Sequence, residues 1–350
     1  MALTSYGVNA PNTVKLFSRK LFREALKAST FAPYMGESSD SMIQVLSDTK
    51  KGPGDRITYQ LRMQLSGAGI AGDSTLEGNE EALTVYTDNI LIDQLRHAVR
   101  SGGKMTEQRI PFSIREEARM GLTDWWTDRI DQSIVNQLCG VTTQSDLRYT
   151  GNNATIAASS ANVVFPLANE ASEVSISTTS LFNLAIIDRA VAKAKTLTPV
   201  IRPIMVNGTG MYVMHIHPHQ VLSLRTSTGQ GLWQDIQKFS MAGMKAMDNP
   251  IFTGALGVYN NVVLKENFRM PLITTASAGT GRRAVLCGAQ AATMAVGQNS
   301  NPEKMSWVEE LFDYENQLGV SAGMIFGVKK TVFNSADFGT IVCPTTTVAP

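Results

Sequence analysis

The stretch that decides the fold reads GPGD at residues 52–55 and continues RITYQLRMQL at residues 56–65. Apolar and polar residues alternate through the second part, which is the period of a half-buried strand. A polar, glycine-rich segment follows at 66–81, and apolar residues return at Leu83, Val85, Tyr86, Ile90 and Ile92. This pattern predicts one long two-stranded arm, in which each strand of about ten residues spans roughly 33 Å. Because an isolated hairpin is marginally stable in water, we expect the arm to lie on another surface, most simply on a neighbouring copy of the chain.

The predicted arm has an apolar face and an acidic tip, and we expect both to contact that neighbour. The apolar face comprises Ile57, Tyr59, Leu61, Met63 and Leu65. The tip carries Asp73, Glu77, Glu80 and Glu81. No lysine or arginine occurs between Arg62 and Arg96, so the tip favours a basic docking surface.

Two basic surfaces are candidates for that docking. A predicted amphipathic helix begins at Asn12 or Thr13 and ends at Ser29. Its polar face is basic and comprises Lys15, Arg19, Lys20, Arg23 and Lys27. This face is either solvated or in contact with DNA or an acidic neighbour. Arg115 and Arg119 form the second candidate surface.

The composition narrows the functional class. The chain has 350 residues, of which 43% are hydrophobic, and a formal net charge of +1. A net charge close to zero creates no strong electrostatic field that would attract nucleic acid or a membrane surface. The first residues lack the basic and apolar regions of a signal peptide, and no run approaches the roughly 18 apolar residues of a spanning helix. The three scattered cysteines indicate free thiols in a reducing cytoplasm.

One segment carries the strongest helix pattern in the chain. Ser113 and Glu116 fit a capping box, and Gly140 stands where the helix would end. The apolar stripe predicts a core face that includes Ile114, Leu122, Trp125 and Ile134. A helix of about 26 residues is roughly 39 Å long, so we expect a strut that packs along a sheet. Because strands and helices do not alternate in regular βαβ order, the predicted fold class is α+β.

A glycine-rich motif lies within the predicted arm. The segment GAGIAG at residues 67–72 matches the G-x-G-x-x-G pattern of dinucleotide-binding loops. Such a loop must open a helix whose N-terminus meets the pyrophosphate. The acidic segment DSTLEG follows at 73–78 instead, so we interpret the glycines as a hairpin tip. No other motif would activate a nucleophile, and the sequence predicts neither enzymatic activity nor a cofactor.

Three histidines lie close together, at His215, His217 and His219. On a strand, His215 and His217 share a face and could converge on a metal ion. Pro218 would break the strand before His219, and the nearest downstream acid is Asp235. We therefore favour a structural or interfacial role, with a cytosolic metalloenzyme using His215 and His217 as the alternative.

A cluster of carboxylates occurs near the C-terminus, in the sequence WVEELFDYE at residues 307–315. On a helix, Glu309 and Asp313 would meet, and paired carboxylates serve acid–base chemistry when burial separates their pKa values. No pocket signature accompanies them. Ion pairs at a subunit boundary are the favoured interpretation.

The order of these parts resembles tailed-phage major capsid proteins of the Hong Kong phage-type fold. Local sequence is similar to the podovirus-like major capsid proteins, and the resemblance is carried by seven strings. These are SSDSMIQV at 38–45, KGPGDRIT at 51–58, LRMQLSG at 61–67, TLEGNEEAL at 75–83, DQLRHAVR at 93–100, REEAR at 115–119 and NPIFTG at 249–254. The strings are specific as a set, and most of them lie within residues 1–140.

The resemblance implies a structural shell subunit with five parts. They are an N-terminal arm at 1–49, an extended loop at 50–103, a peripheral domain at 104–180 with a spine helix at 113–139, an axial domain at 181–300, and C-terminal strands at 301–350 that return to the peripheral domain. It also implies hexamers and pentamers of the chain, a separate scaffolding protein, a portal, and weak contact with packaged double-stranded DNA.

The same resemblance implies a virion capsid that is assembled in the bacterial host cytoplasm, without a membrane. It leaves open whether a decoration protein is added. It also leaves an encapsulin-type compartment as an alternative, since such shells share the fold and hold an enzyme cargo in place of DNA.

Overall fold

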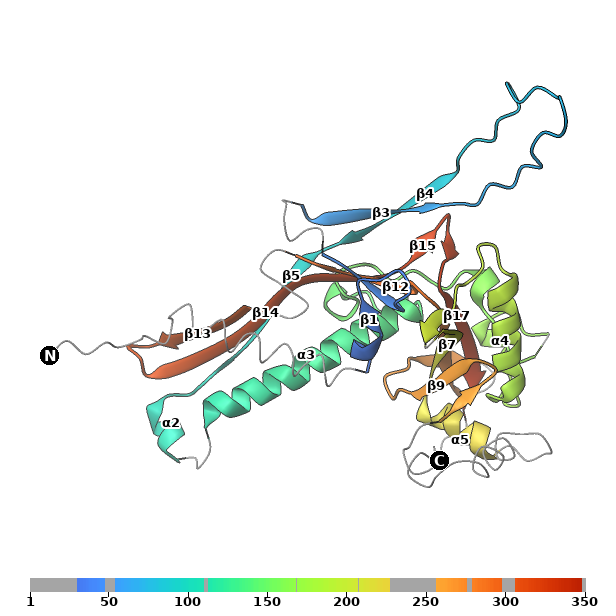
Figure 1. The fold of residues 1–350 in the computed structure, drawn as a ribbon. Coiled ribbons are helices and arrows are strands. Elements are labelled where there is room, and N and C mark those ends of the chain that lie inside the picture. Colours follow the sequence, from blue (N-terminus) through green and yellow to red (C-terminus); the bar gives the residue numbers. More distant parts are fainter. Residues whose placement is uncertain are drawn as a thin grey trace.

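Two β-sheets, one long helix and a projecting hairpin make up the described part of the chain (Figure 1). The computed structural model describes residues 30–47, 54–109, 113–167, 169–206, 208–226, 256–275, 279–297 and 306–347. The class is α+β, as the sequence predicts. Among these residues, no helix combines the length and apolarity that crossing a membrane requires.

The first sheet is built around β14 (Gln317–Lys330), a central strand of 14 residues. One edge of β14 pairs with β5 (Asp93–Arg100). The other edge pairs with β13 (Ser306–Phe312) and, further along, with β12 (Ala292–Val296). The short strands β2 (Ile43–Leu46) and β1 (Met35–Gly36) continue the sheet beyond β12 in parallel. This sheet therefore joins segments from both ends of the chain.

Helix α3 (Ile114–Leu138) is the predicted strut, and it runs along the first sheet (Figure 1). Ser113 is its N-cap, with the side chain accepting from the Glu116 amide. At the other end, Gly140 adopts a φ of +62°. The amides of Gly140 and Val141 bond to the carbonyls of Gln137 and Asn136, which is the Schellman arrangement. Both predicted ends of the helix are confirmed.

The buried stripe of α3 differs from the predicted one at its aromatic residue. Leu122 and Ile134 are fully buried, whereas Ile114 is only partly buried. Trp125, expected in this core, lies at its edge, and Trp126 takes the central position with no exposed surface. The reason is spacing, because Leu122, Trp126 and Ile130 recur every four residues and Trp125 is rotated about 100° from Trp126.

The second sheet has seven strands and is covered by α4 (Leu184–Thr196). Its main path runs β10 (Leu272–Thr275), β11 (Gly279–Cys287), β7 (Thr209–Ile216), β9 (Val262–Glu266) and β8 (Val258–Tyr259). Strand β17 (Thr340–Thr346) pairs with β11, and β6 (Ile204–Val206) pairs with β7. Asn183 caps α4, since its side chain accepts from the Ile186 amide at 3.1 Å.

Alternate residues of the same strands serve two hydrophobic cores. In β11, Ala284 and Leu286 pack in the core under α4, whereas Val285 and Cys287 pack in the core under α3. In β17, Ile341 belongs to the α4 core. Because side chains of a strand alternate between its two faces, the second sheet is buried on both sides and fixes the two cores against each other.

Shorter elements complete the described chain. They are the 3-10 turns η1 (Ala32–Tyr34), η3 (Leu147–Tyr149), η4 (Ser160–Asn162) and η5 (Glu173–Ser175), helices α2 (Lys104–Arg109) and α5 (Pro218–Thr226), and the strand pair β15 (Val332–Phe333) and β16 (Ala336–Asp337). The projecting hairpin consists of β3 (Arg56–Arg62) and β4 (Val85–Leu91).

The strand pairing divides the chain differently from the expected domain limits. Strand β5 lies within the predicted loop at 50–103, yet it belongs to the first sheet. Strand β12 lies within the predicted axial segment and joins the same sheet. Strand β17 comes from the C-terminal segment and joins the second sheet instead of the first. Alternation of apolar and polar residues predicts a strand but not the distant strand with which it pairs. The sequence pattern therefore could not predict which sheet each of these strands joins.

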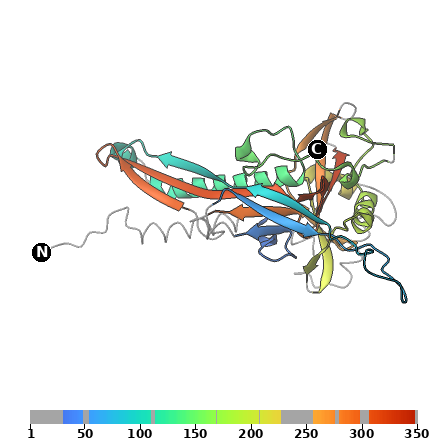
Figure 2. The same ribbon diagram turned by 90° about the horizontal axis from the view of Figure 1, so that it is seen from above.

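The molecule is elongated, and different elements form its two ends. The hairpin of β3 and β4 projects at one end, while the turn between β13 and β14 lies with α2 at the other end (Figures 1 and 2). Both views separate these ends by the full length of α3.

Candidate functional site: the extended arm and its root

The arm is an antiparallel hairpin whose root is packed into the subunit. Its register pairs Arg56 with Leu91 and Arg62 with Val85. At the root, Ile57, Ile90 and Ile92 form a small core with Ala295 of β12. The expectation that the whole apolar face contacts a neighbouring copy is therefore wrong for Ile57, which is buried in its own subunit, and Tyr59 also packs against this small core.

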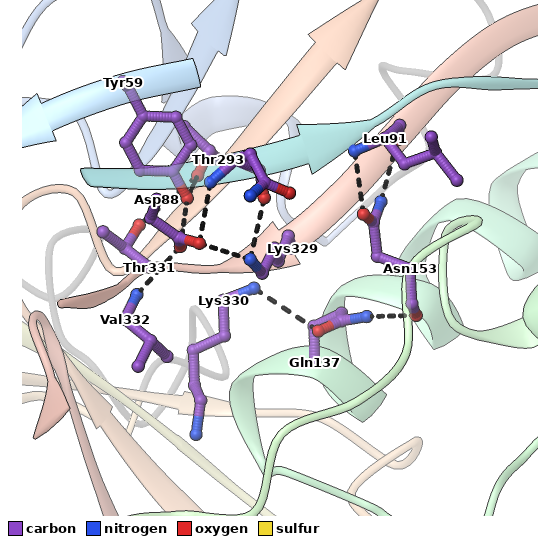
Figure 3. Close-up of polar contacts among 11 residues, drawn as sticks. Tyr59, Asp88, Leu91, Gln137, Asn153, Thr293, Lys329, Lys330, Thr331 and Val332 are labelled. Carbon is purple, nitrogen blue, oxygen red and sulfur yellow. Dashed lines mark hydrogen bonds and ion pairs between the residues drawn. The ribbon is translucent and has the colours of Figure 1, made fainter. Parts of the chain in front are cut away.

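Four residues form a polar clasp at the root, which we define as Tyr59, Asp88, Thr293 and Lys329 (Figure 3). The Tyr59 hydroxyl donates to Asp88 Oδ2 at 2.7 Å and accepts from Thr293 Oγ1 at 3.1 Å. The Lys329 ammonium donates to Asp88 Oδ1 and to the Asn89 carbonyl, the latter at 2.7 Å. The clasp joins both strands of the arm to β12 and β14.

The clasp lies in a nearly dry environment. The Asp88 and Lys329 side chains are 10% and 13% exposed. The ring of Phe333 in β15 meets Tyr59 edge-on, with centroids 5.8 Å apart. Burial and the adjacent Asp88 carboxylate raise the pKa of Tyr59, so the phenol keeps its proton and acts as a donor.

A second polar link ties the arm to the spine helix (Figure 3). The Asn153 side chain accepts from the Leu91 amide and donates to the Leu91 carbonyl, both at 2.9 Å. Gln137 of α3 is fully buried and donates to the Asn153 carbonyl at 2.9 Å. On β14, a Cβ at Gly327 would lie 2.0 Å from the Leu91 carbonyl oxygen, so only glycine fits beneath the arm there. The arm direction is thus set by several independent contacts.

Beyond the root the arm is exposed. Leu61 and Met63 are partly buried, and Leu65 is 56% exposed. The Met63 amide still bonds to the Thr84 carbonyl at 3.0 Å. Glu81 then joins the two sides of the tip, since its carboxylate accepts from the Ser66 and Gly67 amides at 2.8 Å each. These backbone donors lower the pKa of Glu81.

The rest of the tip is acidic and open to solvent. Asp73, Glu77 and Glu80 are exposed, and Glu80 accepts from the Gly78 amide at 2.8 Å. Leu76 is 60% exposed beside them. A mixed apolar and acidic surface at the end of a held arm is suited to binding a protein, and it offers no enclosed site for a small molecule.

The family model described as "Phage capsid protein" matches residues 5–349. The chain belongs to the phage capsid protein family. It is 30% identical over 366 residues to the major capsid protein of Pseudomonas phage KPP25, with 93% of each chain covered. Solved structures with a similar fold include two phage capsids. The capsid of Ralstonia phage GP4 gives a TM-score of 0.80 at 32% identity, covering 100% of this chain and 99% of that chain.

The capsid asymmetric unit of Cyanophage Pam1 gives a TM-score of 0.78 at 21% identity, covering 93% of this chain and 94% of that chain, and it supports the same fold. The chain is thus a major capsid protein of the tailed-phage type, and it has the Hong Kong phage-type fold. These matches are phage capsids, and they favour a phage shell over an encapsulin-type compartment or a metalloenzyme.

Of the two predicted basic surfaces of this capsid protein, the structure describes the second one. The residues Lys15, Arg19, Lys20, Arg23 and Lys27 lie outside the described residues. In the second candidate, the Arg115 Nε donates to Glu309 Oε1 at 2.7 Å. Trp307 Nε1 donates to the same oxygen at 3.1 Å. Arg115 is therefore engaged within its own subunit.

The carboxylate cluster forms a strand and a turn instead of a helix. Residues Ser306–Phe312 are β13, and Asp313 has a φ of +54° in the turn that follows. Glu309 is buried against Arg115 of α3, so this ion pair forms within one subunit.

The histidines are packing residues in this structure. His215 is fully buried against the rings of Phe31 and Tyr34, with centroids 4.6 and 6.1 Å away. Burial lowers the pKa of His215 to about 3. His217 Nδ1 accepts from the His219 amide at 3.1 Å, and burial lowers the pKa of His217 to about 4. Within the described ranges, no group of three or more metal-binding side chains gathers around them.

Sequence reasoning missed the residues that hold the arm. Lys329 and Asp88 are 241 positions apart, and Asn153 and Leu91 are 62 apart. No local pattern relates such positions. The only local signal was the strand alternation that placed Tyr59 on the packed face of the arm.

Proposed function

We propose that this capsid protein builds its shell by laying the arm tip of each subunit on a neighbouring copy. The observation that carries the proposal is the contrast between the two parts of the arm. The root is fixed by the clasp, whereas Leu65 and the acidic tip are exposed among the described residues. A rigid root holds the tip in a binding orientation, which reduces the entropy lost on docking.

The elongated shape supports a head-to-tail arrangement. The arm projects at one end of the elongated subunit, so a contact between the arm of one copy and the body of the next joins different surfaces of the two copies (Figures 1 and 2). Head-to-tail contacts close into rings when the rotation per copy allows it. We propose that these rings are the hexamers and pentamers of an icosahedral shell.

The remaining partners follow from the chemistry of a DNA container. The net charge of +1 suits a shell whose packaged double-stranded DNA is contacted weakly. We infer a separate scaffolding protein and a portal, assembly in the host cytoplasm, and a structural role without catalysis. The polar groups described here hold strands together and form no activated nucleophile.

Deletion of residues 66–81 tests the proposal. The shortened subunit should fold, because the clasp and the root core are untouched, but it should fail to form shells in negative-stain electron microscopy. A matched variant replaces 66–81 by a glycine–serine segment of equal length and separates side-chain contacts from loop length. Normal shells from both variants would refute the role of the tip.

A further inference from the structure

A cavity of about 190 Å³ lies at the C-terminal end of α3. Its lining comes from the helix end at Cys139 and Gly140, from the segment 157–165, and from the second sheet at Arg283 and Val342. The cavity therefore lies at the joint between α3 and the second sheet, where the two hydrophobic cores meet (Figure 1). A molecule bound in it would contact both parts of the subunit at once.

One wall of the cavity is charged, and its polar groups are satisfied within the subunit. Arg283 Nε and Nη2 donate to the two carboxylate oxygens of Glu173 at 2.6 and 2.8 Å. Arg283 Nη1 donates to the carbonyls of Cys139 and Gly140 at 3.3 Å each, at the helix end that favours a cation. Among the residues that the structure describes, no buried side-chain nitrogen or oxygen of the lining lacks a partner. This wall therefore has no unsatisfied group that requires a polar ligand.

The remaining walls are mostly apolar. Val163, Phe165 and Val342 contribute branched and aromatic side chains, and Ala157 and Ala158 contribute methyl groups. Water in a cavity needs two to four polar partners, and these walls do not supply them. A dry apolar cavity of about 150 Å³ is large enough for benzene. Size and lining together favour a small apolar occupant over ordered water.

The charges around the cavity balance one another. Lys330 Nζ donates to the Ala157 carbonyl at 3.2 Å and pairs with Asp337 at 2.7 Å, and both of these side chains are buried. Together with Arg283 and Glu173, the surroundings contain two cations and two carboxylates that are already paired. A charged ligand would lose its hydration on entry and find no free counter-ion among these groups. The cavity therefore favours a neutral ligand.

We propose that this cavity is a binding site for a small neutral aromatic molecule of one or two rings. Phe165 and the guanidinium group of Arg283 are the planar groups that favour an aromatic ring over an aliphatic chain. The bound ring holds the end of α3 against β11 and β17 and so stabilises the joint between the two cores. The site shares no residue with the clasp or the arm, and it does not depend on the proposed function of the arm.

Thermal unfolding of the full-length protein tests the proposal, with indole as the probe and indole-3-carboxylate as its charged counterpart. Indole should raise the Tm in a saturable manner, by about 2 °C at ten times its Kd. Indole-3-carboxylate at the same concentration should leave the Tm unchanged. Ala158→Phe places a ring in the cavity and should abolish the indole effect. A matched control, Ala154→Phe, changes an exposed alanine outside the lining and should keep it. No Tm shift with indole, or an equal shift in Ala158→Phe, would overturn the proposal.

A direct measurement covers the case in which Ala158→Phe folds poorly. Assembled shells of the unsubstituted chain are soaked in 5-iodoindole and compared with unsoaked shells by cryo-electron microscopy. The difference map should show the iodinated ring between Phe165 and Arg283. Ordered water alone in the cavity, or ligand density only elsewhere on the subunit, would overturn the proposal.

Discussion

Replacing Asp88 by alanine should destabilise the subunit because it dismantles the clasp. The change removes the partner of a lysine that is only 13% exposed and the acceptor of the Tyr59 hydroxyl. Removing one partner of a buried ion pair costs about 3–5 kcal/mol. Lys329 keeps the Asn89 carbonyl at 2.7 Å, so we place the loss at the lower end, about 3 kcal/mol.

Urea unfolding followed by tryptophan fluorescence would measure this loss. Deleting residues 66–81 in every variant keeps the subunit unassembled, so the transition reports folding and not shell dissociation. Asp93→Ala is a matched control, since the Asp93 carboxylate is exposed and, among the described residues, bonds to the adjacent Gln94 amide at 2.7 Å. It should cost less than about 0.5 kcal/mol.

The double variant Asp88→Ala, Lys329→Met gives a further check. It removes the charge that Asp88→Ala leaves unpaired and keeps the apolar stem, so it should recover part of the lost stability. The reasoning would be refuted if Asp88→Ala unfolded within about 0.5 kcal/mol of the Asp93→Ala control.

Three further predictions use other parts of the structure. In the same unfolding assay, Trp126→Ala should lower the free energy of unfolding by about 3–5 kcal/mol. Trp125→Ala should lower it clearly less, because Trp126 is the fully buried one of the two. The lowered pKa of His215 means that the unfolded chain binds its proton first, so this residue should reduce stability by about 2 kcal/mol between pH 7 and pH 5, and His217 should add to the loss in the same direction. His215→Phe should therefore make the pH dependence shallower without abolishing it. Boiled, unreduced shells should give a single gel band near 37.9 kDa, since no lysine lies between Lys51 and Lys104 and all three cysteines are buried; a ladder of multimers would contradict this.

Local sequence signals predicted the elements whose determinants are local. The cap at Ser113 and the left-handed Gly140 bound α3, and alternation placed β3 in the arm. The sequence wrongly predicted Trp125 in the core in place of Trp126. An apolar stripe with a spacing of four residues and one with the helical period of 3.6 residues diverge along a long helix. Which of two adjacent tryptophans meets the sheet then depends on how the helix lies on it, through contacts such as that of Trp126 with Phe326.

The candidate site was less predictable, because its contacts join residues far apart in the chain. Alternation marked Ile57 and Tyr59 as one face, but it could not show that Ala295 and Thr293 of β12 lie beneath them. The sequence therefore overestimated how much of the arm needs a neighbour. Among the described residues, the arm is exposed from Gln64 to Val85.

Strand β14 connects the two ends of the subunit. Lys329, near its C-terminal end, holds the arm through Asp88, and residues Gln317 to Gly323, at its N-terminal end, pair with β13. At about 3.4 Å per residue, its 14 residues span roughly 48 Å. The twist of this one strand thus sets the angle between the projecting arm and the opposite end of the sheet. The proposed head-to-tail contact closes into a ring only at particular angles, so under this proposal the contacts that fix the arm on β14 would also govern how many copies a ring contains.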